Sequence, residues 1–201
     1  MHGYTEQLVE VLVGRLFIPL EASGRHVHVT GEQARQLFGH GLTPKRPLSQ
    51  PGQFLANERV TVVGPKGRFE HVAVLGPERK EAQVEVSLTD ARTLGLQPPV
   101  RPSGDVSGSP GAVLIGPKGQ VTLSRGVIAA QRHIHMTPED AARFRVADKQ
   151  RVSLKTFTDR PAVLEDVLVR VSPDFATFAH LDYDEANACG FRKGDLGRIL
   201  K

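Results

Sequence analysis

The segment Arg25-His-Val-His-Val-Thr-Gly-Glu-Gln-Ala34 decides the fold, because the sequence repeats it 107 residues later as Arg132-His-Ile-His-Met-Thr-Pro-Glu-Asp-Ala141. In both copies histidines alternate with apolar residues, which is the two-residue period of a β-strand. A threonine follows, and three residues after it stands Gln33 or Asp140, the arrangement of a helix N-cap. The repeat therefore predicts a strand that leads directly into a capped helix in each half of the chain.

A second pair of matching segments supports an internal duplication of the chain. Glu85-Val-Ser-Leu-Thr-Asp-Ala-Arg-Thr-Leu-Gly95 aligns with His180-Leu-Asp-Tyr-Asp-Glu-Ala-Asn-Ala-Cys-Gly190. Each segment reads as a strand, a capping residue, a short helix and a glycine that can take the left-handed conformation at the helix end. We therefore predict two copies of one β-rich module with short helices at the ends.

The rest of the sequence favours a mainly β fold. Its apolar stretches are short and rich in valine, which is typical of strands. Gly64-Pro-Lys-Gly67 and Gly116-Pro-Lys-Gly119 each lie between two such stretches and predict β-hairpins. Residues 5–17 carry apolar side chains at helical spacing and predict an amphipathic N-terminal helix, whereas 97–110 predicts a connector. Small β-barrels would leave these strands without exposed edges.

Composition and charge limit the classes of protein that the chain can belong to. With 39% hydrophobic and 24% charged residues, general disorder and coiled coil are disfavoured. The single cysteine excludes an intrachain disulfide and a cysteine-rich zinc finger. No apolar run reaches the roughly 18 residues of a membrane span, so we expect a soluble intracellular protein. The net charge of +4 suits an anionic small molecule as well as nucleic acid.

The two His-x-His pairs are the strongest chemical signal in the sequence. Alternate residues of a strand point to the same face, about 7 Å apart at the backbone, which is the spacing of two ligands of one metal ion. The duplication supplies a third donor in each copy, because Glu85 and His180 occupy the same place in the second repeat. Three nitrogen and oxygen ligands with an open position are typical of catalytic zinc, although manganese, cobalt or iron would also accept them. The first set is His26, His28 and Glu85, and the second is His133, His135 and His180.

Other polar residues allow two interpretations each. Arg79 stands in a turn before the strand that carries Glu85, where it could hold a phosphate or carboxylate or simply face solvent. Arg25 and Arg132 precede the His-x-His pairs and could be ion-pair partners or anion binders. Cys189 is more plausible as a packed thiol than as a nucleophile. The remaining histidines fit no metal-binding pattern, and we expect them to face solvent; they are His2, His40 and His71.

Several motifs in the same order resemble the PduL-type phosphate propanoyltransferases, also called phosphotransacylases. The resemblance runs from about residue 18 to the C-terminus. The motifs that carry it are Arg25-His-Val-His-Val-Thr, Leu48-Ser-Gln-Pro-Gly-Gln-Phe54, Val74-Leu-Gly-Pro-Glu-Arg79, Gln83-Val-Glu-Val-Ser-Leu-Thr-Asp90, Ser103-Gly-Asp105, Arg132-His-Ile-His-Met-Thr-Pro-Glu-Asp140 and His180-Leu-Asp-Tyr-Asp-Glu-Ala-Asn187.

This resemblance implies two interleaved β-barrels capped by short α-helices, two zinc ions between them, a homodimer, and acyl transfer between coenzyme A and phosphate. It implies domains at 25–130 and at 131–201 with a strand from about 18–24, after an N-terminal helix at 1–17. Matched by position, the two histidine-rich sets are zinc ligands and Arg79 binds phosphate. The positions matched to coenzyme A contacts are Ser23, Arg46, Leu75 and Asn187. Gly24 departs from the family, which usually has asparagine there.

Alternative functions and locations stay open at this stage. A binuclear zinc hydrolase of phosphate esters or thioesters would use the same ligands. A non-catalytic basic barrel that binds nucleic acid is disfavoured by the low aromatic content of 5% and the absence of tryptophan. Many relatives enter bacterial microcompartments through an extra N-terminal peptide, and here the predicted helix begins almost at Met1. We therefore expect no separate targeting extension, and both cytoplasm and microcompartment lumen remain possible. We expect neither nucleic acid nor membrane as a partner.

Overall fold

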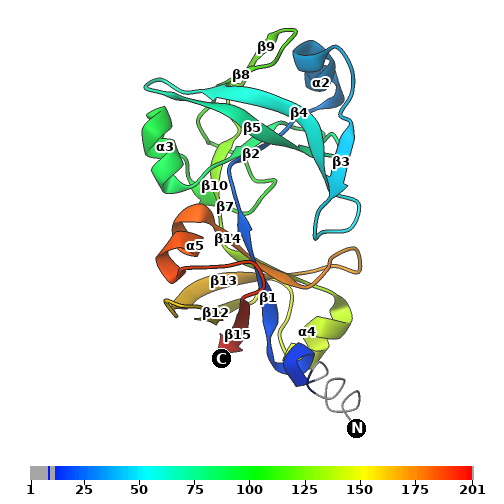
Figure 1. The fold of residues 1–201 in the computed structure, drawn as a ribbon, viewed down its shortest axis with the longest axis vertical. Helices are drawn as coiled ribbons and strands as arrows, with labels where there is room; N and C mark the ends of the chain where they lie inside the picture. The colour runs from blue at the N-terminus through cyan, green and yellow to red at the C-terminus, as the bar shows by residue number, and fades with distance from the viewer. Residues whose placement is uncertain (1–8, 10–11, 201) are drawn as a thin grey trace. The chain divides into compact units, whose positions relative to one another are not determined.

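The computed structural model describes residue 9 and residues 12–200. It contains 41% strand and 18% helix, so the predicted mainly β fold is confirmed (Figure 1). Much of the helix predicted over 5–17 lies outside the described residues; within it, residue 9 and residues 12–16 are helical. No helix in the described part of the chain is both long and apolar enough to span a membrane.

The described chain folds into two compact units. We call one the barrel unit; it contains the residues up to Ser23, Arg132–Leu181 and the residues from Glu185 onward. The other, the half-barrel unit, contains Gly24–Gln131 and Asp182–Asp184. The domain bounds expected from the sequence stay a prediction.

In the barrel unit, six strands of the described chain close into a barrel in the order β1-β14-β11-β13-β12-β15. The N-terminal strand β1 is antiparallel to the C-terminal strand β15, with Ile18 opposite Gly197. The elements are β1 (Ile18–Ser23), β11 (His133–Met136), α4 (Pro138–Phe144), β12 (Arg151–Phe157), β13 (Val163–Val171), β14 (Phe178–Asp182), α5 (Tyr183–Cys189) and β15 (Leu196–Leu200).

In the half-barrel unit, the described strands form one nine-stranded sheet in the order β7-β10-β6-β2-β5-β4-β8-β9, with β3 paired to β4. The elements are β2 (His26–His28), α2 (Gly31–Phe38), β3 (Pro44–Pro47), β4 (Phe54–Val63), β5 (Arg68–Gly76), β6 (Gln83–Glu85), α3 (Leu88–Leu94), β7 (Val100–Arg101), β8 (Val113–Ile115), β9 (Gln120–Thr122) and β10 (Val127–Ala130). Of the two predicted barrels, one is therefore closed and the other is a half-barrel sheet.

The helix starts predicted from the repeats are confirmed. Thr30 caps α2 in a reciprocal capping box with Gln33, and Thr137 accepts a hydrogen bond from the Asp140 N–H at the start of α4. Ser87 caps α3 in the same way. Gly95, which follows α3, has a φ of 76°, as expected for a glycine that ends a helix. Each short helix therefore begins directly after the strand that precedes it.

Both predicted hairpins are confirmed. The 64–67 turn joins the antiparallel strands β4 and β5, and the 116–119 turn joins β8 and β9. In each turn the N–H of the first glycine donates to the carbonyl of the last, at 2.9 Å. The first hairpin joins two inner strands of the half-barrel sheet, and the second ends at its edge strand β9.

The alternation within the strands separates an apolar core face from a polar face. Val27, between His26 and His28, is fully buried in the core of the half-barrel unit, as is Val84 in β6. Ile134, between the second pair of histidines, is fully buried in the core of the barrel unit. Because neighbouring residues of a strand point to opposite faces, the histidines are held on the face away from each core.

Candidate metal centres

Strand register brings three donors together in the half-barrel unit. His26 and Glu85 are directly opposite each other on the antiparallel strands β2 and β6, and His28 lies two residues further along β2 on the same face. The rings of His26 and His28 are 5.0 Å apart. Ligating atoms of the three side chains all lie within 4.8 Å of one another, and all three residues are buried. We call this group cage A.

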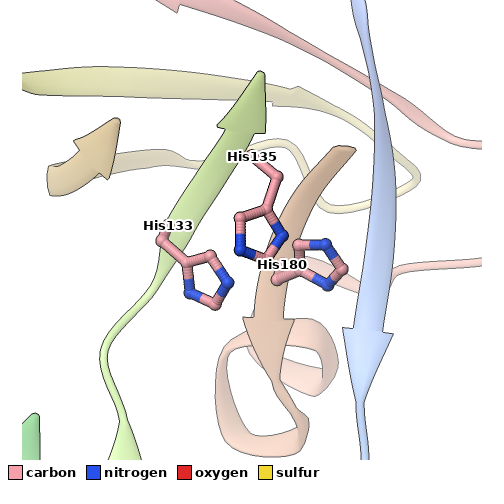
Figure 2. Close-up of side chains that lie close together, drawn as sticks. All are labelled: His133, His135 and His180. Atoms are coloured by element: carbon pink, nitrogen blue, oxygen red, sulfur yellow. The ribbon is translucent and has the colours of Figure 1, made fainter. Parts of the chain in front are cut away.

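The barrel unit holds a matching group. His133 is opposite His180 on the antiparallel strands β11 and β14, and His135 lies two residues further along β11. Figure 2 shows the rings of His133 and His135, from one strand, close to the ring of His180. Their centroids are 4.5–5.0 Å apart, and their ligating atoms lie within 4.8 Å of one another. We call this group cage B. Within the described residues, these two cages are the groups of at least three side chains that could hold a metal ion.

The outer nitrogens of the cage A histidines are anchored to the backbone. Nδ1 of His26 donates to the Gly24 carbonyl at 2.8 Å, and Nδ1 of His28 donates to the Leu75 carbonyl at 3.2 Å. A ring that donates from Nδ1 presents Nε2 to the cage, which is the usual arrangement around a metal-ligating histidine. In cage B, Nδ1 of His180 lies 3.4 Å from a carboxylate oxygen of Glu21.

Cage A has the electrostatics of a cation site. Burial opposes the charged form of Glu85, yet the nearby His26 lowers the pKa of that carboxyl well below its usual value. Burial likewise opposes charge on His26, but the Glu85 carboxylate, 3.5 Å from Nε2, raises the pKa of His26. Burial, together with the charges of His26 and Arg79, lowers the pKa of His28 to about 3. An ionised carboxylate therefore lies beside two imidazoles, one of which remains neutral at ordinary pH.

Arg79 lies beside cage A. Its backbone N–H donates to the Val29 carbonyl at 2.9 Å, which fixes the turn between β5 and β6 to the end of β2. Its guanidinium donates to the Ser103 hydroxyl at 3.3 Å, and that hydroxyl donates to the Glu85 carboxylate at 2.8 Å. Its positive charge contributes to the lowered pKa of His28 and partly opposes the raised pKa of His26. Arg79 therefore lies near cage A, and its role in binding phosphate stays a prediction.

Sequence reasoning missed two polar residues of this site. Gln83 is buried with 2% exposure on the same face of β6 as Glu85, and Ser103 bridges Glu85 and Arg79. Gln83 stands two positions before Glu85 in β6, so strand alternation was an available signal that it shares the face of Glu85. Ser103 follows a proline in the connector, 18 residues after Glu85. No sequence periodicity ties this connector to β6.

Comparison with known proteins identifies the family of the chain. The family model described as phosphate propanoyltransferase matches residues 19–192. The chain belongs to this family. It is 53% identical to the phosphate propanoyltransferase of Enterococcus faecalis, over 97% of this chain and 96% of that protein. It is 49% identical to that of Clostridioides difficile, over 100% and 99%, and 53% identical to that of Thermotoga maritima, over 89% and 87%.

Membership of the phosphate propanoyltransferase family confirms the predicted family and the predicted class of enzyme, a transferase. Gly24, where the family resemblance implies asparagine, lies against Tyr183. A Cβ atom at Gly24 would lie 2.7 Å from the ring of Tyr183, so a larger residue here would require this ring to shift. The Gly24 carbonyl still accepts from His26.

The resemblance matched four positions to coenzyme A contacts, and two of them lie in each unit. Ser23 ends β1 and Asn187 is exposed on α5, both in the barrel unit. Arg46 is exposed on β3 and Leu75 is half-buried on β5, both in the half-barrel unit. The role of these four residues stays a prediction.

The residues expected to have no catalytic role fit that expectation where the structure describes them. Cys189 is fully buried with Leu181 and Ala186, and burial raises the pKa of its thiol, which makes it a poor nucleophile. His40 and His71 are exposed. His2 lies outside the described residues.

Arg25 and Arg132 are both ion-pair partners in this chain. Arg25 makes a bidentate contact with Asp90 on α3, at 2.9 and 2.6 Å, and its guanidinium lies over the ring of Phe69. Arg132 donates to Glu185 on α5 at 2.6 Å. In each unit the arginine before the His-x-His pair therefore contacts the helix that follows the strand of the third cage residue.

We expect Arg25→Leu to lower the free energy of unfolding by about 1–3 kcal/mol, because it leaves the Asp90 carboxylate, only 6% exposed, without its guanidinium. Urea denaturation followed by circular dichroism measures the change. Arg68→Leu is the matched control, since its ion pair with Glu70 is exposed on both sides and should contribute below about 1 kcal/mol. Equal losses in the two variants would show that Arg25 has no special structural role.

Proposed function

We propose that the protein is a phosphate acyltransferase that interconverts a short-chain acyl-CoA, such as propionyl-CoA or acetyl-CoA, plus phosphate with acyl phosphate plus free coenzyme A. One observation carries this proposal within the family: two three-donor cages, of which cage A adjoins an arginine tied to it through Ser103. Cationic groups arranged around a compact site suit a reaction in which a multiply charged anion attacks a neutral thioester.

We further propose that each cage holds one zinc ion. The donor sets fit: three histidines in cage B, and two histidines and a carboxylate in cage A, are combinations found in catalytic zinc sites, which leave a coordination position open. The lowered pKa of Glu85 supports the same conclusion, since it keeps the carboxylate ionised and able to act as a ligand. A bound divalent metal would stabilise negative charge on phosphate oxygen and lower the pKa of the coenzyme thiol.

The reaction forms one bond and breaks another. An oxygen of hydrogen phosphate attacks the thioester carbonyl carbon and forms the carbon–oxygen bond; the carbon–sulfur bond breaks, and sulfur keeps its electron pair. The proton of hydrogen phosphate passes to the leaving thiolate or to solvent. Direct attack by phosphate needs no covalent acyl-enzyme. The burial and raised pKa of Cys189 agree with this, because they make the thiol a poor nucleophile.

Arg79 is the residue that we assign to phosphate. A guanidinium can place two parallel N–H groups against two oxygens of the anion, and this charge-assisted contact holds phosphate in one orientation. Arg79 is half-buried and its guanidinium donates to Ser103, so the side chain has few conformations available before phosphate binds. Orientation of one reactant against the other is a large part of catalysis in group transfer.

The remaining assignments rest on the family resemblance. We propose that Ser23, Arg46, Leu75 and Asn187 contact coenzyme A, for which the exposed guanidinium of Arg46 suits the phosphate groups. We also propose a homodimer located in the cytoplasm or in the lumen of a bacterial microcompartment. Analytical ultracentrifugation and fractionation of the native host would test the last two points.

A thiol-release assay tests the function. With acetyl-, propionyl- or butyryl-CoA, we expect free thiol to appear only when phosphate is present, and this activity to fall after prolonged chelation and to return with added zinc. Thiol release that does not require phosphate would instead indicate a binuclear hydrolase. If no thioester is consumed under any of these conditions, the proposed function is wrong.

A further inference from the structure

We propose that Gln83 is a positioning residue, which sets the orientation of the Glu85 carboxylate and of the Ser103 turn and thereby couples cage A to Arg79. This inference rests on the proposed function, since it concerns how the chain prepares cage A for a metal ion and Arg79 for phosphate. It assigns no contact between Gln83 and the reacting atoms.

The first argument is the placement of Gln83 within the sheet. It is the register partner of His28 across the β2–β6 pair and lies two residues before Glu85, so all these side chains emerge on one face. Val84, between Gln83 and Glu85, is fully buried in the core on the other face. Gln83 is itself only 2% exposed. A buried amide is costly unless its polar atoms are satisfied, so its partners define what it does.

The second argument is the set of partners. The Gln83 Nε2 group donates to the Glu85 carboxylate and to the Ser103 hydroxyl, the latter at 2.9 Å. Its Oε1 accepts from the Gly104 backbone N–H at 2.7 Å. An amide side chain has two N–H donors and one carbonyl in a single plane, and here both kinds of atom are used. One planar group therefore fixes the carboxylate and the turn at 103–104 relative to each other.

The third argument is the path to Arg79. Ser103 donates to Glu85 at 2.8 Å and accepts from the Arg79 guanidinium at 3.3 Å. The turn that carries Ser103 belongs to the connector, and Gly104 in this turn is held by Gln83. Loss of the amide would release both ends of this turn from Gln83. It would affect the cage ligand and the phosphate-binding arginine together.

Cage B supplies an internal comparison. Glu85 corresponds to His180 in the duplication, so Gln83 corresponds to Phe178, which is the register partner of His135. The ring of Phe178 lies 6.5 Å from that of His180 and has no amide to offer. The unit with a carboxylate in its cage therefore has the amide, and the unit with three imidazoles does not. This difference is expected if the amide serves the carboxylate.

The test compares Gln83→Met and Gln83→Glu with the unchanged protein. Met keeps the approximate volume but makes no comparable hydrogen bond, whereas Glu keeps an acceptor for Gly104 and loses the donors to Glu85 and Ser103. Zinc titration against a chromophoric chelator is expected to show one of two ions bound about 10- to 100-fold more weakly in both variants, the range typical of outer-shell partners, while the other ion is unchanged. The KM for phosphate should rise in parallel.

Gln36→Met is the matched control, because Gln36 is an exposed residue of α2 whose amide donates to the Gln120 carbonyl away from both cages. It should leave zinc affinity and phosphate KM unchanged. If circular dichroism shows that Gln83→Met is unfolded, the zinc affinity and phosphate KM of Gln83→Glu alone test the proposal. Zinc affinity and phosphate KM equal to those of the unchanged protein would overturn the role of Gln83. An unchanged protein that binds no zinc or shows no phosphate-dependent thiol release would instead contradict the proposed function.

Discussion

Glu85→Ala and His133→Ala are each expected to lower phosphate-dependent thiol release by more than about 100-fold, since loss of even an outer-shell partner of a metal site typically costs 10- to 100-fold. Each change removes one of three donors from a different cage. A site left with two donors should release its ion, so zinc content should fall from two ions to one per chain. Elemental analysis of the purified variants, alongside the thiol assay, measures both effects.

The design separates loss of a ligand from loss of the fold. Glu85→Gln keeps the size of the side chain and removes only its charge, and it should still lose the metal of cage A. His71→Asn is the matched control, because His71 is exposed and has a φ of 56°, a conformation that asparagine also adopts readily. Full activity in a variant that has lost one ion would show that the cage concerned is not part of the catalyst.

The duplication explains why much of the fold could be predicted from the sequence. The Thr30 and Thr137 caps, the 64–67 hairpin and the 116–119 hairpin depend on residues within a few positions of one another. The repeat also indicated which later residues match each other, so Glu85 and His180 could be placed with the histidine pairs. Cross-strand register then made each of them the direct partner of the first histidine in its pair.

Other parts of the site depend on interactions between distant segments, which no local pattern encodes. Ser103 reaches Glu85 from a connector that has no periodicity, and the guanidinium of Arg79 reaches Ser103 from a turn. Closure of the barrel also depends on distant segments. It requires β1, the first of the described strands, to pair with β15, the last of them. Long-range pairing of this sort is set by the packing of whole strands rather than by the residues of either strand alone.

Arg79→Ala is expected to raise the KM for phosphate, or for acyl phosphate in the reverse direction, by about 10- to 100-fold. A hydrogen bond to a charged group contributes about 1.5–3 kcal/mol, and about 1.4 kcal/mol corresponds to a factor of ten. The KM for acyl-CoA should change much less, because the guanidinium is assigned to the anion and not to the thioester. Initial rates over a grid of phosphate and acyl-CoA concentrations separate the two constants.

Two further variants make this result specific to the guanidinium. Arg79→Lys keeps the charge but not the planar pair of donors, so its KM for phosphate should lie between those of the unchanged protein and Arg79→Ala. Lys80→Ala removes an exposed charge from the neighbouring position of the same turn and should leave the KM for phosphate nearly unchanged. Zinc content should remain at two ions per chain in all three variants, because neither Arg79 nor Lys80 is one of the three donors of cage A. An unchanged KM for phosphate in Arg79→Ala would reject the assignment of Arg79 to phosphate. An equal rise of this KM in Lys80→Ala would show that surface charge in general, and not the guanidinium of Arg79, is responsible.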